Sequence, residues 1–312
     1  MTSNNYRNRI FAKPTVILLF FFCSPFLMHT QSIVQGYEKY GTLLQLKIEN
    51  GMFPDSLRSK GHKYDGITYS YEGHYDDNTV FVFIPDYFKA GKRTDIVVHF
   101  HGWYNNLDSV VKTYQLIEQF HAAGRNAILI LPQGPKNAPD SYGGKLEKAG
   151  VFRLFLGEVL TGLTGGKIVG ETTIGNVVIS GHSGAYRVMA HILLHGGVPV
   201  QEVYLFDGLY GQLEKYGHWL SQTKGRFINI YTADGGTFED TQDFMTDLKG
   251  WDIPFLATEE SGVNEDLLKK QRILMIYTSL SHNEVIHVHQ YFYKYLATSF
   301  CLKKRYHFGT MI

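Results

Sequence analysis

The sequence has few cysteines, and this limits how its fold can be stabilised. Only Cys23 and Cys301 occur among 312 residues. If the first thirty residues are removed, as argued below, Cys301 is the only cysteine left and no internal disulfide can form. We therefore expect the fold to depend on its hydrophobic core, even in an oxidising compartment.

The chain also has no large excess of positive or negative charge. The chain carries 30 basic and 29 acidic residues, and no run of Lys and Arg is interleaved with aromatic residues. Because binding to a phosphate backbone demands a basic face, nucleic acid is not an expected partner. The hydrophobic and charged fractions, 44% and 19%, are ordinary for a globular protein and exclude disorder, collagen and coiled coil.

No apolar run reaches the about 20 residues that a transmembrane helix needs. The most apolar stretch, Thr15–Met28, follows Arg7, Arg9 and Lys13, and no acidic residue occurs in this region. This arrangement is typical of a secretory signal peptide. We therefore predict that residues 1–30 are a signal peptide and that the protein is secreted or periplasmic.

Removal of this segment leaves a nearly neutral chain with 27 basic and 29 acidic residues. The remaining residues, 31–312, contain no repeat, low-complexity tract or long linker, so they are expected to form one domain. Contact with a membrane is expected only if the N-terminal segment stays uncleaved as an anchor.

Strands that are buried on both faces are predicted by short, continuous apolar runs. Segments with helical spacing lie between them; one carries Val110, Tyr114, Ile117 and Phe120 and is placed to end at Gly124. A second stripe of this kind follows the last run, at Val285, Val288, Phe292 and Leu296. The alternation predicts an α/β fold with a doubly wound, mostly parallel sheet. The apolar runs are Ile96–Phe100, Ala127–Leu131, Val177–Ser180, Val203–Phe206, Phe227–Tyr231 and Ile273–Tyr277.

Upstream of these runs the sequence indicates an N-terminal antiparallel hairpin. Ile67–Tyr71 and Thr79–Ile84 flank Asp76-Asp77-Asn78, a sequence that favours a turn. With this hairpin the sheet is expected to have about eight strands. The segment 235–271 is long for a connection between strands and is either a cap over a cleft or ordinary surface packing.

One serine is crowded by small residues in Gly181-His182-Ser183-Gly184-Ala185, directly after a predicted strand. Such a sequence can form a plain turn in which the serine caps the next helix. It can also form a nucleophile elbow, where the tight turn between strand and helix exposes the serine oxygen. Residues elsewhere in the chain distinguish these two interpretations.

Other reactive side chains also follow predicted strands. His282 comes after the last strand, and Asp207 and Asp234 follow two earlier ones. Because the carboxyl ends of parallel strands meet at one edge of the sheet, we expect Ser183, one aspartate and His282 to converge there.

These features together resemble the α/β-hydrolase superfamily. The likeness covers residues 67–296 and depends on the Gly181–Ala185 motif, the order serine, acid, histidine and the strand-helix alternation. The motif usually ends in glycine, and Ala185 departs from it. The resemblance implies Ser183 as nucleophile and His282 as its base. It favours Asp234 as the acid, with Asp207 as the alternative.

The resemblance extends to the turn that would bind negative charge on a substrate oxygen. His101-Gly102-Trp103 is similar to the family's oxyanion turn. The backbone amides of Trp103 and Gly184 would be the donors, and Gly102 would allow close approach of the substrate. No cofactor is implied.

Two histidine pairs are candidate metal ligands, His99 with His101 and His287 with His289. No acidic ligand stands at a fitting spacing, so we expect no metal.

The sequence therefore predicts an exported serine hydrolase that cleaves small-molecule or polymer esters through an acyl-enzyme. Two alternatives stay open. One is a serine peptidase or amidase that uses the same residues, and the other is a non-catalytic binding module on the same scaffold.

Overall fold

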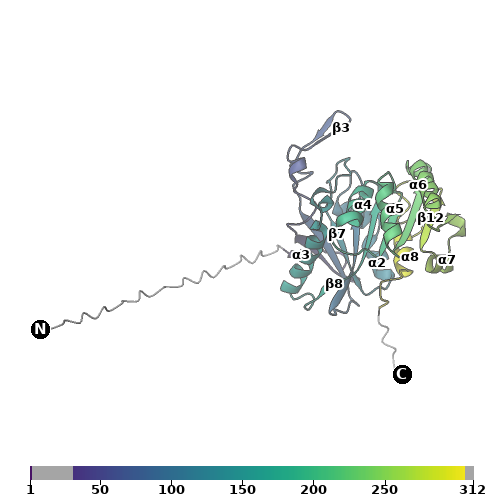
Figure 1. The fold of residues 1–312 in the computed structure, drawn as a ribbon. Helices are drawn as coiled ribbons and strands as arrows, with labels where there is room; N and C mark the ends of the chain where they lie inside the picture. The colour runs from purple at the N-terminus through teal and green to yellow at the C-terminus, as the bar shows by residue number, and fades with distance from the viewer. Residues whose placement is uncertain (2–30, 306–312) are drawn as a thin grey trace, which may run out of the picture.

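A computed structural model describes Met1 and residues 31–305 of the chain (Figure 1). Apart from Met1, the predicted signal peptide lies outside the described residues. Within the described range, no helix has both the length and the apolar character needed to cross a membrane.

Ten strands form the main sheet, in the order β1-β2-β5-β7-β6-β8-β9-β10-β12-β11. The strands from β7 to β11 along this order are parallel to their neighbours, whereas β1, β2 and β5 pair antiparallel. The mostly parallel sheet and all six predicted apolar runs are confirmed. The strands are β1 (Gln31–Ile33), β2 (Gly41–Lys47), β5 (Thr79–Pro85), β6 (Arg93–Phe100), β7 (Ala127–Pro132), β8 (Thr173–His182), β9 (Glu202–Phe206), β10 (Arg226–Thr232), β11 (Leu256–Glu259) and β12 (Ile273–Thr278).

The predicted pairing of the N-terminal hairpin is wrong. Strand β5 pairs with β2, while Ile67–Tyr69 (β4) pairs with His62–Tyr64 (β3) in a separate small sheet. All seven residues of β5 are buried, and β2 supplies three buried leucines against it, whereas Ile67 is 57% exposed. Burial rather than closeness in sequence therefore selects the partner. The β3–β4 hairpin projects from the body of the molecule (Figure 1).

Helices cover both faces of the sheet. Successive residues of β6 point to opposite faces, so Ile96 and Val98 join one hydrophobic cluster and Val97 joins the other. The first cluster packs under α3 to α6, and the second under α1, α2, α7 and α8. The helices are α1 (Leu107–Thr113), α2 (Leu116–Ala122), α3 (Val151–Gly165), α4 (Tyr186–His195), α5 (Leu213–Gln222), α6 (Phe238–Gly250), α7 (Glu265–Lys270) and α8 (Tyr291–Ala297).

Two predicted helices differ from the structure at residues with left-handed backbone. The stripe from Val110 to Phe120 is broken into α1 and α2 at Gln115, where φ is +50°. Gly124 ends the second piece with φ +61°, as predicted. The last stripe was expected from Val285, but α8 starts after Gln290, where φ is +53°. A left-handed residue cannot continue a right-handed helix, so each helix begins after it.

Residues 235–271 contain α6, β11 and α7. Strand β11 extends the edge of the main sheet beside β12, and α6 lies against α5 and β10. The residues that line the pocket described below all come from outside this segment.

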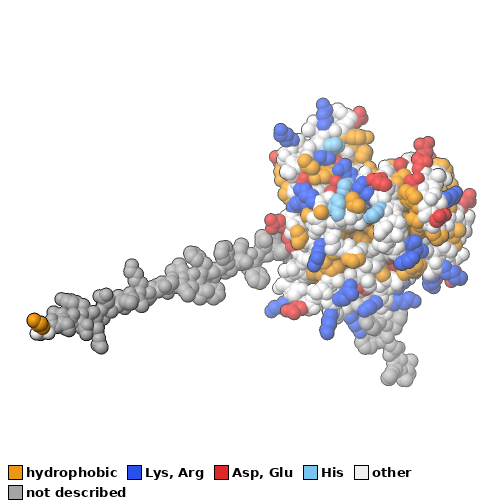
Figure 2. Space-filling model, in the orientation of Figure 1, with side chains coloured by type: hydrophobic (Ala, Val, Ile, Leu, Met, Phe, Trp, Pro, Cys, Tyr) orange, Lys and Arg blue, Asp and Glu red, His pale blue; other side chains and the backbone are white. Residues whose placement is uncertain are grey.

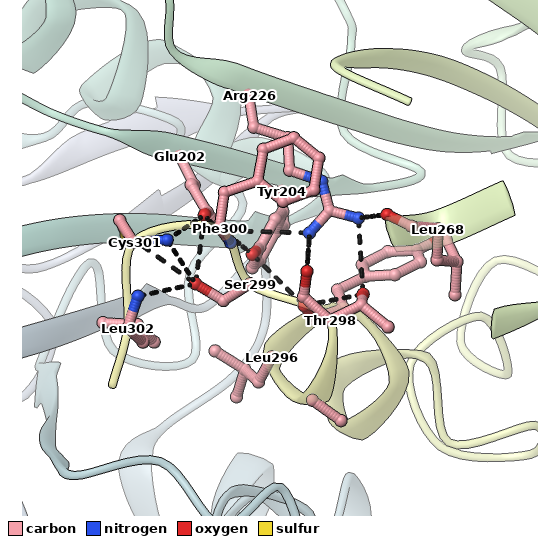
Figure 3. Close-up of polar contacts among 12 residues, drawn as sticks. Glu202, Tyr204, Arg226, Leu268, Leu296, Thr298, Ser299, Phe300, Cys301 and Leu302 are labelled. Atoms are coloured by element: carbon pink, nitrogen blue, oxygen red, sulfur yellow. Dashed lines mark hydrogen bonds and ion pairs between the residues drawn. The ribbon is translucent and has the colours of Figure 1, made fainter. Parts of the chain in front are cut away.

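A buried polar cluster ties the end of the chain to the amino ends of β9 and β10 (Figure 3). The Glu202 carboxylate accepts from the backbone N–H of Phe300 at 2.5 Å and that of Cys301 at 3.0 Å. The Arg226 guanidinium donates to the Thr298 carbonyl at 3.0 Å and lies 4.4 Å from the centre of the Phe300 ring. Both charged side chains are only 1% exposed, so each needs these partners.

Replacement of Glu202 by alanine should destabilise the fold strongly. It leaves Arg226 as a buried charge without its carboxylate and unpairs two backbone donors, so we expect a loss of about 3–5 kcal/mol in the free energy of unfolding. Urea denaturation measures this loss. The control is Glu265→Ala, because Glu265 is exposed on α7 and pairs with Lys269 across one turn. Equal midpoints for the two variants would contradict the role given to Glu202.

Candidate active site

Ser183 occupies a strained turn between β8 and α4. It begins a single 3₁₀ turn, Ser183–Ala185, and its φ of +56° is rare for any residue other than glycine. A Cβ placed on Gly181 would lie 2.7 Å from the Cβ of Ala185 and 2.5 Å from the sulfur of Met189. Glycine at 181 therefore makes room both for alanine at 185 and for the Met189 side chain. The tight turn of the elbow interpretation is present despite Ala185.

Asp207 follows β9 and lies completely buried beside His282. Its Oδ2 is 2.6 Å from Nδ1 of His282. It also accepts from the backbone N–H of Thr232 at 3.0 Å, from the Thr232 hydroxyl at 2.9 Å and from the hydroxyl of Thr237. Burial favours the neutral acid, but the hydrogen bonds from His282 and Thr237 outweigh it and lower the pKa of Asp207. The carboxylate is therefore ionised at neutral pH.

The structure brings Asp207, and not the favoured Asp234, to the imidazole. Asp234 lies on an exposed turn after β10. Asp207 follows its strand directly, and its backbone N–H donates to the Ile230 carbonyl at 2.8 Å. This bond holds Asp207 across the end of β10. A Cβ on Gly235 would lie 1.6 Å from Oδ2 of Asp207, so the turn that carries Asp234 must have glycine at 235 to make room for the other carboxylate.

Ser183 and His282 line one pocket of about 620 Å³ at the carboxyl ends of the strands. On the face drawn in Figure 2, the surface is hollowed between the lobe with the projecting hairpin and the lobe that contains α6. Tyr210 lines the same pocket: its ring centre is 6.3 Å from that of His282, and its hydroxyl donates to the Gly235 carbonyl. Burial raises the pKa of Tyr210, so this phenol is neutral.

The predicted oxyanion turn lies against the serine. A Cβ on Gly102 would be 2.6 Å from the Cβ of Ser183 and 3.2 Å from its hydroxyl oxygen. A Cβ on Gly184 would be 2.5 Å from Cδ1 of Trp103. The two turns are therefore packed closely together, and the structure brings Gly102, Trp103, Ser183 and Gly184 to one place.

His101 fixes the orientation of this turn, a function that the sequence analysis did not assign. Its Nε2 accepts from the Gly134 N–H at 2.9 Å and from the Gln133 amide at 2.8 Å, so its hydrogen is on Nδ1. Nδ1 then donates to the Gly102 carbonyl at 2.8 Å. In a trans peptide the N–H points opposite to the carbonyl, so the Trp103 N–H is directed away from His101. Burial lowers the pKa of His101 to about 4, which keeps the ring neutral.

One histidine of each pair considered for a metal has another partner at Nδ1. Nδ1 of His99 lies 2.9 Å from the Ser180 hydroxyl, and Nδ1 of His289 contacts the Glu260 carboxylate. Among the described residues, no three His, Cys, Asp or Glu side chains are grouped so that they could hold a metal ion.

The β3–β4 hairpin meets the rim of the pocket, another contribution that sequence reasoning missed. The Tyr64 ring packs edge-on against Trp103, with 5.2 Å between centres, and Tyr69 lies 6.3 Å from Tyr104. At the base of the hairpin, Arg58 donates to both carboxylate oxygens of Asp140, at 2.6 and 3.1 Å. The only sequence signal for this contact is the density of tyrosine in the segment.

No protein-family model matches this chain, and no curated protein matches it either. Among solved structures, the feruloyl esterase module from Clostridium thermocellum, a mutant complexed with sinapinate, superposes with a TM-score of 0.51 at 11% identity. The match covers 90% of this chain and 97% of that one. The chain has the α/β-hydrolase fold.

Two further solved structures are similar to this α/β-hydrolase fold at lower scores. A ferulic acid esterase has a TM-score of 0.49 at 13% identity and covers 72% of this chain and 92% of its own. An S-formylglutathione hydrolase from Agrobacterium tumefaciens has a TM-score of 0.43 at 14% identity and covers 85% of this chain and 95% of its own.

Proposed function

We propose that this protein is a serine hydrolase that cleaves carboxylic esters through an acyl-enzyme. The observation that carries the proposal is the 2.6 Å contact between buried Asp207 and His282, in the same pocket as the strained Ser183. A capping serine in a plain turn requires neither an imidazole nor a buried carboxylate beside it. Asp207 is the acid that supports His282 in this mechanism.

The hydrogen bond to Asp207 defines the chemistry of His282. A carboxylate can only accept, so Nδ1 of His282 carries a hydrogen and Nε2 is the free base. Nε2 takes the proton of Ser183 while the serine oxygen bonds to the ester carbon. The imidazolium then gives that proton to the departing alcohol as the carbon–oxygen bond breaks. Water then attacks the carbonyl carbon of the acyl-serine while Nε2 of His282 takes its proton. The bond to the serine oxygen breaks, the imidazolium returns the proton to that oxygen, and the carboxylic acid is released.

Two backbone donors stabilise the tetrahedral intermediate in this mechanism. The negative oxygen accepts from the N–H groups of Trp103 and Gly184, and the loss of one such donor typically costs about 10²–10³ in rate. Asp207 remains ionised because hydrogen bonds lower its pKa, and its negative charge stabilises the imidazolium.

The pocket favours an uncharged substrate that carries an aromatic ring. Rings of Trp103, Tyr104, Tyr186 and Tyr210 line it, and no Lys, Arg, Asp or Glu is among its described lining residues. Flat ring walls gain contact area and favourable ring geometry from a flat ligand. The feruloyl esterase module with the same fold is complexed with sinapinate, and this supports an aryl-bearing ester as the substrate class.

Ser183→Ala should abolish turnover of aryl esters, with kcat/KM lower by a factor on the order of 10⁶. A fluorophosphonate probe should label Ser183 in the wild-type protein and leave the variant unlabelled, as read by peptide mass spectrometry. Matched ester and amide substrates are assayed together. Unchanged ester turnover in the variant would refute the proposal, and cleavage of the amide alone would replace the esterase by an amidase.

The two aspartates give a matched pair of variants. Asp207→Asn should lower kcat by a factor on the order of 10⁴, because an amide neither holds the required tautomer of His282 nor stabilises its charge. Asp234→Asn should leave kcat unchanged, since Asp234 is exposed and the residues that hold Asp207 are Thr232, Thr237 and His282. Steady-state kinetics on one aryl ester compares them. The reverse order of effects would reassign the acid to Asp234.

We further propose that the protein is exported by its N-terminal segment. Residues 1–35 fused to an alkaline phosphatase that lacks its own leader should give phosphatase activity, because its disulfides form only outside the cytoplasm. The matched control changes Arg7, Arg9 and Lys13 to glutamate, which removes the basic flank of the apolar run. Equal activity from the two fusions, or none from the first, would oppose export by this segment.

A further inference from the structure

His182 is a buried histidine that the proposed mechanism does not use. It is the last residue of β8, directly before Ser183, and only 1% of it is exposed. Its Nε2 lies 2.9 Å from the backbone carbonyl oxygen of His282, 100 residues away in the sequence. Because a carbonyl can only accept, the ring hydrogen is on Nε2 and His182 is the donor.

The segment that this bond holds has no regular structure of its own. Residues 279–290 connect β12 to α8, and His282–His289 form consecutive turns. Within this segment His282 is held twice: its ring by Asp207 and its backbone by His182. Asp207 follows β9 and His182 ends β8, so two neighbouring strands each hold one part of the same residue.

The surroundings of His182 keep its ring uncharged. Its ring centre lies 4.5 Å from that of His282, with 34° between the planes. The Tyr114 hydroxyl lies 3.5 Å from Nδ1 of His182 and 3.3 Å from Oδ1 of Asn283, on the same turn as His282. Burial, and next to it the proximity of His282, lower the pKa of His182 to about 3. His182 therefore adds no positive charge beside the imidazole that must become protonated.

We propose that His182 is a positioning residue that sets the distance between the Ser183 hydroxyl and the His282 imidazole by holding the His282 backbone. The inference builds on the proposed function. Ser183 is the next residue after His182, so a shift of the His282 turn away from His182 is also a shift away from the serine. A misplacement of about 1 Å can cost about 10² in rate.

Three substitutions at position 182 separate the hydrogen bond from the bulk of the ring. His182→Gln places an amide N–H near the position of Nε2 and is uncharged, so it can donate to the His282 carbonyl. His182→Asn also donates, but its amide is nearer to the position of Nδ1 and does not reach that carbonyl. His182→Phe keeps a planar ring and has no donor. Urea midpoints show which variants are folded.

We expect His182→Phe and His182→Asn to lower kcat on an aryl ester by about 10- to 100-fold with KM nearly unchanged, and His182→Gln to regain most of this loss. The rate of fluorophosphonate labelling at Ser183 should follow the same order. A merely structural role would instead lower the urea midpoint of all three variants and leave kcat of the folded protein intact. Equal kcat for Gln, Asn and Phe, whether at the wild-type level or below it, would overturn the inference.

A second measurement distinguishes this inference from the proposed function. The Nδ1 proton of His282, held by Asp207, should give a far-downfield proton resonance that His282→Ala removes. It should persist in His182→Gln and be shifted or broadened in His182→Phe. A wild-type protein that shows this resonance but is never labelled at Ser183 would refute the hydrolase proposal alone. An unchanged resonance in His182→Phe would refute the positioning role alone.

Discussion

The site depends on a carboxylate that is completely buried. Removing an ion from water costs several kcal/mol, and Asp207 offsets that cost with hydrogen bonds from three residues, His282, Thr232 and Thr237. These donors belong to the turn after β12, to the end of β10 and to the start of α6. The charge of Asp207 thereby holds together the loops that follow β9, β10 and β12. The same requirement explains why Gly235 has no side chain, since its Cβ would occupy the space of the carboxylate oxygen.

The sequence was sufficient to predict that Ser183 and His282 lie at one edge of the sheet, beside the turn at Gly102. Ser183 and Gly102 follow short apolar runs that indicate buried strands, and the carboxyl ends of parallel strands share one edge. Which of the two aspartates lies beside His282 could not be predicted from the sequence. Asp207 and Asp234 both follow a strand and stand near glycine, so counting positions cannot separate them. The difference is that Asp207 leaves its strand with a left-handed φ of +44°, which turns its side chain across the neighbouring strand, and this depends on contacts distant in sequence.

The centre of the fold could also be predicted from the pattern of apolar residues, whereas its edges could not. Continuous apolar runs marked the six central parallel strands, because these are covered on both faces. The edges were not predictable in this way. Strand β2 has exposed and half-buried positions, and β11 has none that is fully buried. Their place is determined by the neighbours β5 and β12, which lie elsewhere in the chain.

In the part of the chain that the structure describes, β3 and β4 of the projecting hairpin pair only with each other and not with the main sheet. The hairpin is attached to the body through side chains, by Arg58 on Asp140 at its base and by Tyr64 on Trp103 near its tip. Natural variation can therefore exchange, shorten or lengthen this hairpin without disturbing a single strand that carries the reactive groups. Changes in this hairpin and changes in the strands that lead to Ser183, Asp207 and His282 can thus accumulate independently in this chain.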